Sequence, residues 1–357
     1  MKLRVKANLK MIRNLVFFIA LIFLTFWFIF KDQDINELIN VLKSANTVWI
    51  LVGIGIMIIY YLIEALNIKS ILKILGEKIS IFSALKFTWI GFFFSSITPA
   101  ATGGQPVEIY YMTKENFSGP NATLALLIQL CGFQISTITY GIVCSFFYWH
   151  ILSKFLWLYL IGLTINGFAL ALMLIGIFSE KLTKKLINLI MQIMKFFRVK
   201  NIEVKREKIE EGLKSYNESA IFIKSHMSEF IKAILRVFVQ IAFYYCVPFC
   251  VYKSFGLNTY NIFQMFAMQA VVYTTVSSIP LPGAIGISET IFLSIFGVAF
   301  GKELLSGAML LSRGITFYLF VIISLLIVMI NAIRKNHIKG EIDKKIIEFE
   351  TQFEIWN

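Results

Sequence analysis

Two short segments of the chain set small polar residues, glycines and prolines beside a glutamate, and both interrupt long apolar stretches. Residues 95–108 read SSITPAATGGQPVE, and residues 277–289 read SSIPLPGAIGISE. Each segment begins with Ser-Ser-Ile and ends on a glutamate nine residues after a proline. Backbone that leaves a helix at membrane depth is tolerated only inside protein or facing a watery cavity. Both segments are therefore predicted to line such a cavity, where their hydroxyls and amides supply neutral hydrogen bonds.

The two glutamates, Glu108 and Glu289, are each expected at or near the start of the helix that follows. The free N–H groups of a helix N-terminus attract a phosphate or carboxylate, so each helix start is a candidate anion site. A carboxylate in the first helical turn also caps the helix. The sequence leaves two roles open for these residues, a structural cap and a part in substrate or proton handling, and the roles can coexist.

Arg313 lies well inside the last apolar stretch, where a charged side chain is costly and needs a partner or a cavity. Its candidate partners are Glu289, Glu108 and the phosphate of a lipid. Glu64, near the end of another stretch, is expected to reach the membrane interface. The candidate substrate-binding residues are Ser95, Ser96, Thr98, Pro99, Thr102, Gly103, Gly104, Gln105, Glu108, Ser277, Ser278, Pro280, Pro282, Gly283, Gly286, Glu289 and Arg313.

The composition is that of a membrane protein with several spans. Of the 357 residues, 58% are apolar and only 15% are charged. A helical span needs about 20 apolar residues, and the apolar length suffices for about six or more spans. The net charge is +13, but the basic residues lie between apolar stretches. That placement favours a role in topology, with the anionic inner leaflet as partner, over binding to nucleic acid.

The residues that usually hold metals or cofactors are scarce. The 4 cysteines fall inside apolar stretches without a Cys-x-x-Cys motif, and the chain has 3 histidines. We predict buried thiols and no metal site, disulfide framework or cofactor. A Walker A motif is absent from the sequence, so we expect that this chain does not use ATP.

The order of the stretches predicts an all-α transmembrane helical bundle in two halves, each with a Pro/Gly-broken re-entrant helix pair. The predicted parts are an N-terminal half at 1–178 with a broken segment at 84–115, a cytoplasmic amphipathic linker at 179–228, a C-terminal half at 229–335 with a broken segment at 262–300, and a cytoplasmic tail at 336–357. The predicted spans are about 14–30, 48–66, 122–149, 155–178, 230–252 and 304–330, with a charged connector at 67–83.

The positive charges predict how the chain is oriented. Most of the 34 Lys and Arg residues lie in four segments, 1–13, 67–83, 179–228 and 331–357. These segments are therefore placed inside, in the cytoplasmic membrane of a bacterial cell, with both termini cytoplasmic. The arrangement holds only if each broken segment makes an even number of crossings. The first then enters from the cytoplasm and the second from outside.

Similar segments that enter from opposite faces are typical of an inverted repeat. Paired Gly/Pro-interrupted hydrophobic segments indicate the binding site of a transporter. The alternative is a pair of unrelated Pro/Gly turns between helices, and the spacing by itself leaves that alternative open.

The longer motifs SSITPAATGGQPVEIYYMTKE and SSIPLPGAIGISETIFLSIFG together resemble the transmembrane family named after lysylphosphatidylglycerol synthase. The resemblance covers roughly residues 10–335. Its best-known member is the flippase half of the multiple peptide resistance factor, which serves antibiotic resistance by moving aminoacylated phosphatidylglycerol to the outer leaflet. The resemblance implies a two-part helical bundle with re-entrant elements. It also implies that 95–108 and 277–289 line a lipid headgroup cavity whose charged members are Glu108, Glu289 and Arg313.

The sequence departs from the full-length synthase, which carries a large soluble domain that transfers lysine from tRNA to the lipid. We expect this chain to lack that domain, and we therefore interpret it as a transporter rather than an enzyme. The expected activity is that of a lipid transporter or flippase. Its expected substrate is an anionic or aminoacylated phospholipid, or a related lipid phosphate. Two alternatives stay open. One is the membrane component of a phosphatidylglycerol lysyltransferase with a separate catalytic partner, and the other is a small-solute transporter. Proton coupling through the glutamates is a hypothesis, and a homo-oligomer is compatible with the sequence.

Overall fold

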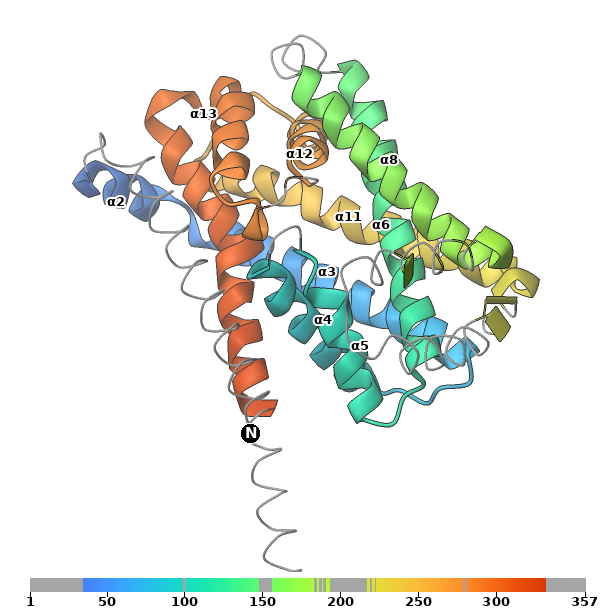
Figure 1. The fold of residues 1–357 in the computed structure, drawn as a ribbon. Helices are drawn as coiled ribbons and strands as arrows, with labels where there is room; N and C mark the ends of the chain where they lie inside the picture. The colour runs from blue at the N-terminus through green and yellow to red at the C-terminus, as the bar shows by residue number, and fades with distance from the viewer. Residues whose placement is uncertain are drawn as a thin grey trace, which may run out of the picture.

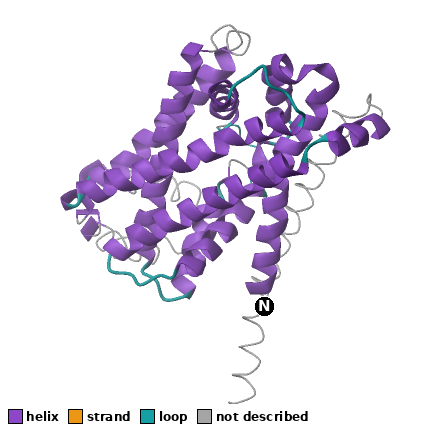
Figure 2. Cartoon of the chain, turned by 180° about the vertical axis from the view of Figure 1, so that it is seen from behind, coloured by secondary structure: helices purple, strands orange, loops and turns teal. Residues whose placement is uncertain are grey.

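The computed structural model describes residues 35–98, 101–147, 156–182, 217–218, 220–221, 223–277, 279 and 281–331, with isolated positions at 185, 188, 191 and 192. Every regular element in this part of the chain is a helix, which confirms the predicted all-α class (Figure 2). The predicted first span, most of the linker and the charged tail lie outside the described residues.

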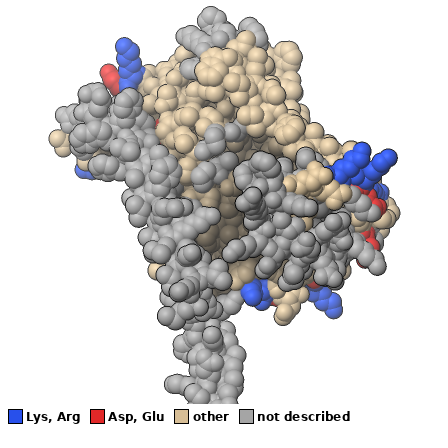
Figure 3. Space-filling view, in the orientation of Figure 1, with Lys and Arg blue, Asp and Glu red and all other residues tan. Residues whose placement is uncertain are grey.

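Five of the described helical segments are long and apolar enough to cross a membrane. Large apolar side chains lie exposed on them, such as Trp157 and Phe168, as they would against lipid. The charged side chains of described residues that are visible in Figure 3 lie at the periphery of the molecule. The chain is therefore a multi-pass membrane protein. Its candidate spans are α3 (Thr47–Ile74), α6 (Gly119–Phe147), α8 (Leu156–Phe178), α11 (Met227–Ser254) and a stretch within the segment Pro282–Asn331.

Helix α3 is longer than the sequence indicated. We predicted a span at 48–66 followed by a connector, but α3 continues to Ile74. The lysines of this region are spaced so that Ile68, Ile71 and Leu72 still share one buried face. Asn67, which the prediction placed in the connector, is fully buried within the helix.

The first broken segment forms a hairpin of two short helices, α4 (Ile81–Ser96) and α5 (Gly104–Lys114). Their 16 and 11 residues are fewer than the about 20 that a helix needs to cross a bilayer. The Ser80 hydroxyl accepts the Ser83 N–H and so caps the start of α4. An ion pair between Lys86 and Glu115 joins the open ends of the two helices.

The second broken segment forms a similar hairpin. Helix α12 (Ile262–Val276) begins with a capping box between Asn261 and Gln264. A short 3-10 turn, η3 (Pro282–Ala284), leads into α13 (Ile287–Arg313). Helix α13 itself breaks at Gly301, where φ is +68° and ψ is 171°. The chain therefore runs along α12 to the tip of the hairpin, returns along η3 and the first part of α13, and turns again at Gly301.

The two hairpins point at each other from opposite ends of the helical bundle (Figure 1). Their interrupted tips touch, because Phe93 and Ile97 at the end of α4 pack with Ile285 and Phe317 in one buried cluster. Each hairpin follows a helix of 28 residues, α3 or α11, and these two helices pack together. Helices α6 and α8 cover one side, and the short α2 (Ile35–Ser44) packs on α13.

The break at Gly301 generates a test of this architecture. Its backbone conformation is one that only glycine adopts readily, so Gly301→Ala should destabilise the protein by about 1–3 kcal/mol. Gly297 is the matched control, because a Cβ there meets Leu305 at an ordinary 3.5 Å. We expect Gly301→Ala to lower the apparent unfolding temperature in detergent and Gly297→Ala to leave it unchanged or raise it. Equal effects of the two variants would contradict the turn.

Candidate functional site

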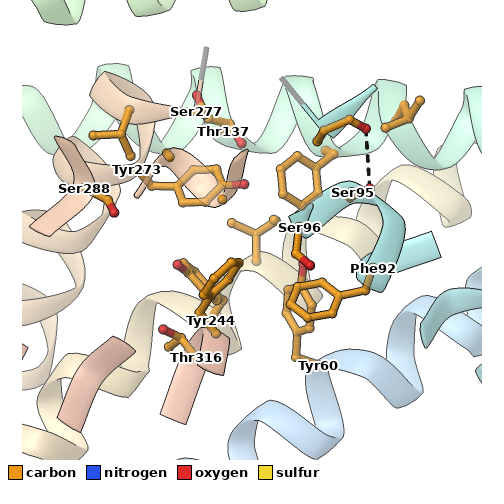
Figure 4. Close-up of a pocket in the computed structure, with 18 of the residues that line it drawn as sticks. Tyr60, Phe92, Ser95, Ser96, Thr137, Tyr244, Tyr273, Ser277, Ser288 and Thr316 are labelled. Atoms are coloured by element: carbon orange, nitrogen blue, oxygen red, sulfur yellow. Dashed lines mark hydrogen bonds between the residues drawn. The ribbon is translucent and has the colours of Figure 1, made fainter. Parts of the chain in front are cut away.

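A cavity of about 520 Å³ lies where the tips of the two hairpins approach each other. Both interrupted loops contribute to its wall, and α3, α6 and α11 complete it. Figure 4 shows Ser95 and Ser96 of the first hairpin on one side and Ser288 of the second on the other, with Tyr244 and Tyr273 beside the same space. Such a wall of hydroxyls and aromatic rings can hold a polar group inside an apolar bundle.

A buried ion pair joins the two arms of α13 at the cavity. The Nε of Arg313 donates to Oε1 of Glu289 over 2.7 Å, and its Nη2 donates to the carbonyl oxygen of Gly283 over 3.0 Å. The two charged residues lie at equal sequence distances on either side of Gly301, as expected for two antiparallel arms. Arg313 lines the cavity, whereas the Glu289 side chain is fully buried behind it. Of the three candidate partners named from the sequence, Glu289 is therefore the one that pairs with Arg313.

Glu289 is occupied on its second oxygen as well. Oε2 accepts the N–H of Gly286 over 2.7 Å and the hydroxyl of Ser288 over 2.9 Å, so the side chain caps α13. The Gly286 N–H is therefore taken by the protein's own carboxylate, and of the two roles that the sequence left open for Glu289 the structural cap is present. Helix α5, in contrast, begins at Gly104 without a capping side chain.

Two aromatic side chains also pack against the guanidinium of Arg313. A single π-helical turn, η4 (Gly314–Tyr318), follows Arg313 and places two rings beside it. The Phe317 centroid lies 4.5 Å from Cζ of Arg313, and the Tyr318 hydroxyl donates to Oε1 of Glu289 over 3.3 Å. At Gly283, φ is +60° and a Cβ would lie 2.3 Å from the Phe317 ring, so the turn requires glycine.

Glu108 has a different environment. It lines the cavity and is 5% exposed, and its Oε1 has no hydrogen-bond partner among the described residues. Lys86 of the same hairpin is paired with Glu115 instead. Gly91 leaves the space for this carboxyl, because a Cβ there would lie 2.6 Å from Oε2 of Glu108. A buried carboxylate without a cation is costly, so Glu108 suits a proton or the cationic group of a ligand.

The structure brings about half of the candidate substrate-binding residues to the cavity wall. Others lie behind the wall and shape the loops; for example, Oγ1 of Thr98 accepts the N–H of Gly103 over 2.9 Å. Pro99, Ser278 and Pro280 lie outside the described residues. The candidates that line the cavity are Ser95, Ser96, Thr102, Gln105, Glu108, Ser277, Gly283 and Arg313. Those that do not are Thr98, Gly103, Gly104, Pro282, Gly286 and Glu289.

Sequence reasoning missed one charged residue of the cavity. Glu64 lines it and accepts a hydrogen bond from Gln240 over 2.9 Å, so the expectation that it reaches the membrane interface was wrong. The physical reason is the extension of α3 to Ile74, which moves Glu64 away from the helix end. Two polar residues inside predicted spans, Gln129 and Gln240, were the signal that could have drawn attention to it.

These features define the class of the protein: a polytopic α-helical membrane protein in which two interrupted hairpins meet at a central cavity whose largely apolar wall carries a few charged and hydroxyl side chains. The chain belongs to the family described as the lysylphosphatidylglycerol synthase TM region, whose model matches residues 15–324. It is also similar to a UPF0104 membrane protein of Archaeoglobus fulgidus, with 24% identity over 324 residues, which are 88% of this chain and 96% of the relative. The family predicted from the two motifs is confirmed.

The contrast between Glu289 and Glu108 leads to a prediction about stability. Glu289→Gln removes the charge partner of a buried arginine, which should cost about 3–5 kcal/mol. Glu108→Gln removes a carboxyl that has no cation among the described residues, so it should leave stability unchanged or raise it. Thermal unfolding of both variants in the same detergent measures the difference. Similar losses of stability in the two variants would contradict a larger contribution of the Glu289–Arg313 ion pair to the free energy of unfolding.

Proposed function

We propose that this protein is a lipid transporter that moves an anionic or aminoacylated phospholipid, or a related lipid phosphate, between the two leaflets. The cavity between the hairpin tips would hold the headgroup during the crossing. Its volume of about 520 Å³ falls in the range of ordinary ligand pockets, roughly 300–1,000 Å³. That space suits a headgroup whose acyl chains stay in the bilayer.

The observation that carries the proposal is the meeting of two interrupted hairpins from opposite ends of the bundle, around one cavity (Figure 1). Transporters built from interrupted helices bind their substrates near the bilayer midplane and expose them to each side in turn. A headgroup at the hairpin tips would be reached from one side when the first hairpin moves and from the other when the second moves. The similarity between the hairpins supports an inverted repeat as part of the same proposal.

The charged groups of the wall fit a headgroup with groups of both signs. Arg313, held in place by Glu289, offers a guanidinium to a phosphate. Glu108 and Glu64 offer carboxyl oxygens to an ammonium group. The hydroxyls of Ser95, Ser277 and their neighbours supply hydrogen bonds that do not depend on charge. An aminoacylated phospholipid would use all three kinds of contact.

The transport reaction can be measured in proteoliposomes that contain the purified protein. We would offer headgroup-labelled phosphatidylglycerol, lysyl-phosphatidylglycerol and a polyprenyl phosphate. Arg313→Ala should slow translocation of the preferred lipid by about tenfold or more, because charge-assisted hydrogen bonds to the phosphate are lost. Arg313→Lys keeps the charge and should retain part of the rate.

A matched pair of glutamates in the first hairpin controls for general effects of charge. Glu108 lines the cavity, whereas Glu115 lies beyond the end of α5 in an ion pair with Lys86. Glu108→Gln should change the rate or the choice of lipid, and Glu115→Gln should not. If folded, correctly oriented protein moves none of the three lipids, the lipid transporter is excluded and a soluble solute becomes the better candidate.

The same proposal places the protein in a bacterial cytoplasmic membrane with both termini inside. Lys78, between α3 and α4, would then face the cytoplasm, and Lys302, at the turn of α13, would face outside; both are exposed. Lys302→Cys should react with a membrane-impermeant maleimide on intact cells, and Lys78→Cys should react only after permeabilisation. The native cysteines lie in apolar helices and contribute little background. The reverse pattern would invert the proposed topology.

A further inference from the structure

A continuous chain of side-chain hydrogen bonds runs from Arg236 to Glu64 through three amides. Nη1 of Arg236 donates to Oδ1 of Asn67 over 3.3 Å, and Nδ2 of Asn67 donates to Oε1 of Gln129 over 2.5 Å. Nε2 of Gln129 donates to Oε1 of Gln240 over 2.9 Å, and Nε2 of Gln240 donates to Oε2 of Glu64 over 2.9 Å. The three amide side chains are buried, at 0%, 5% and 0% exposure. We call these five residues the amide relay.

The chemistry of the two end groups fixes the direction of the relay. A guanidinium can only donate hydrogen bonds, and an ionised carboxylate can only accept them. Every amide between them must therefore accept on its oxygen from the arginine side and donate from its nitrogen towards the glutamate side. The dipoles of the three amides then align from the positive Arg236 to the negative Glu64. Aligned hydrogen bonds in a chain strengthen one another in a medium of low dielectric constant.

Helix geometry brings the members of the relay together. Glu64 and Asn67 lie one turn apart on α3, Arg236 and Gln240 lie one turn apart on α11, and Gln129 bridges them from α6. Such a network also fastens three helices to one another, which is reason enough for its presence in a membrane bundle. Stabilising the packing of three helices does not require the network to end on a carboxylate at the cavity wall. This network does end there, on Glu64.

The relay ends at the cavity wall on Glu64, and it uses only one of the two carboxyl oxygens. Oε2 is used by Gln240, and Oε1 makes no hydrogen bond within the described part of the chain. The three carboxyls at the cavity differ in what balances them. Glu289 has Arg313 in direct contact, Glu108 has no cation among the described residues, and Glu64 has a cation only at the far end of the relay.

We propose that Glu64 is a cation-binding residue of the cavity, and that Arg236 is its positioning residue, which orients the Gln240 amide towards the Glu64 carboxyl through the amide relay and so favours its ionised form. The ligand class is a cationic N–H donor, supplied by an ammonium headgroup or by a free amine. This inference rests on the proposed function for its lipid source. Arg236 does not touch the ligand and acts only through the amides.

The protonation state of Glu64 can be read without measuring transport. Dicyclohexylcarbodiimide reacts with protonated carboxyls in apolar surroundings, and peptide mass spectrometry assigns the adduct to Glu64. The labelled fraction is measured against pH for the full-length protein in phosphatidylglycerol vesicles. The other charged or titratable side chains in the cavity wall are Tyr60, Tyr61, Glu108, Tyr244, Tyr273 and Arg313. All of them are unchanged in the variants, so a difference in profile reports on the relay.

Breaking the relay should make Glu64 easier to protonate. In Arg236→Met and in Gln129→Met, the pH of half-maximal labelling should rise by about one unit, a tenfold change in proton affinity. Arg236→Lys keeps the charge and should restore most of the wild-type profile. Gln269→Met is the matched control, because Gln269 is a buried glutamine of the same cavity outside the relay. It should leave the profile unchanged.

Two arms identify the source of the cation. Phosphatidylethanolamine in the vesicles should protect Glu64 from labelling if a lipid headgroup is the ligand, whereas soluble ethanolamine should protect it if a free amine suffices. Protection by neither, or identical pH profiles in Arg236→Met, Gln129→Met and wild type, would overturn the inference. Failure of the protein to move any lipid would remove the proposed function but leave the pH profiles standing as a test of the relay.

Discussion

A bilayer offers no water to the backbone of an interrupted helix, and this constraint governs the rest of the structure. The loops after α4 and α12 leave the helical path, so their polar groups must find partners inside the protein. Both loops therefore turn inwards and meet around a shared cavity that contains charged and hydroxyl side chains. The long helices α3, α6, α8 and α11 form the apolar exterior that makes this interior possible.

Charge inside such a bundle needs compensation, and the three carboxyls at the cavity illustrate different solutions. Glu289 is neutralised in contact by Arg313 and also caps α13, so it belongs to the framework. Glu64 is linked to a distant arginine through amides. Glu108 has neither kind of partner among the described residues. The proposed transport function assigns ligand contact to the last two, because a carboxyl that is already fully satisfied has little to offer a ligand.

The two motifs allowed much of this to be predicted from sequence, because glycine, proline and isolated charges inside apolar stretches have few structural explanations. They located both hairpins, and the position of Arg313 inside an apolar stretch indicated three candidate partners, of which Glu289 is the one observed. The end of α3 was misjudged because lysines at 69 and 73 resemble a surface connector, while the buried face they leave apolar is apparent only in the packed bundle. The role of Glu64 was misjudged for the same reason.

By itself, the sequence determined the membrane class, the all-α fold, the family and the two places where helices break. The family rests on the resemblance of the two motifs, and the other three depend on local composition or on short spacings, which act within one helix or one turn. Only the tertiary structure decided that Glu289 lies behind Arg313 rather than in the wall, and that Asn67, Gln129 and Gln240 connect Glu64 to Arg236. Those contacts join side chains up to 176 residues apart, and such pairs meet only because helices distant in sequence pack against one another.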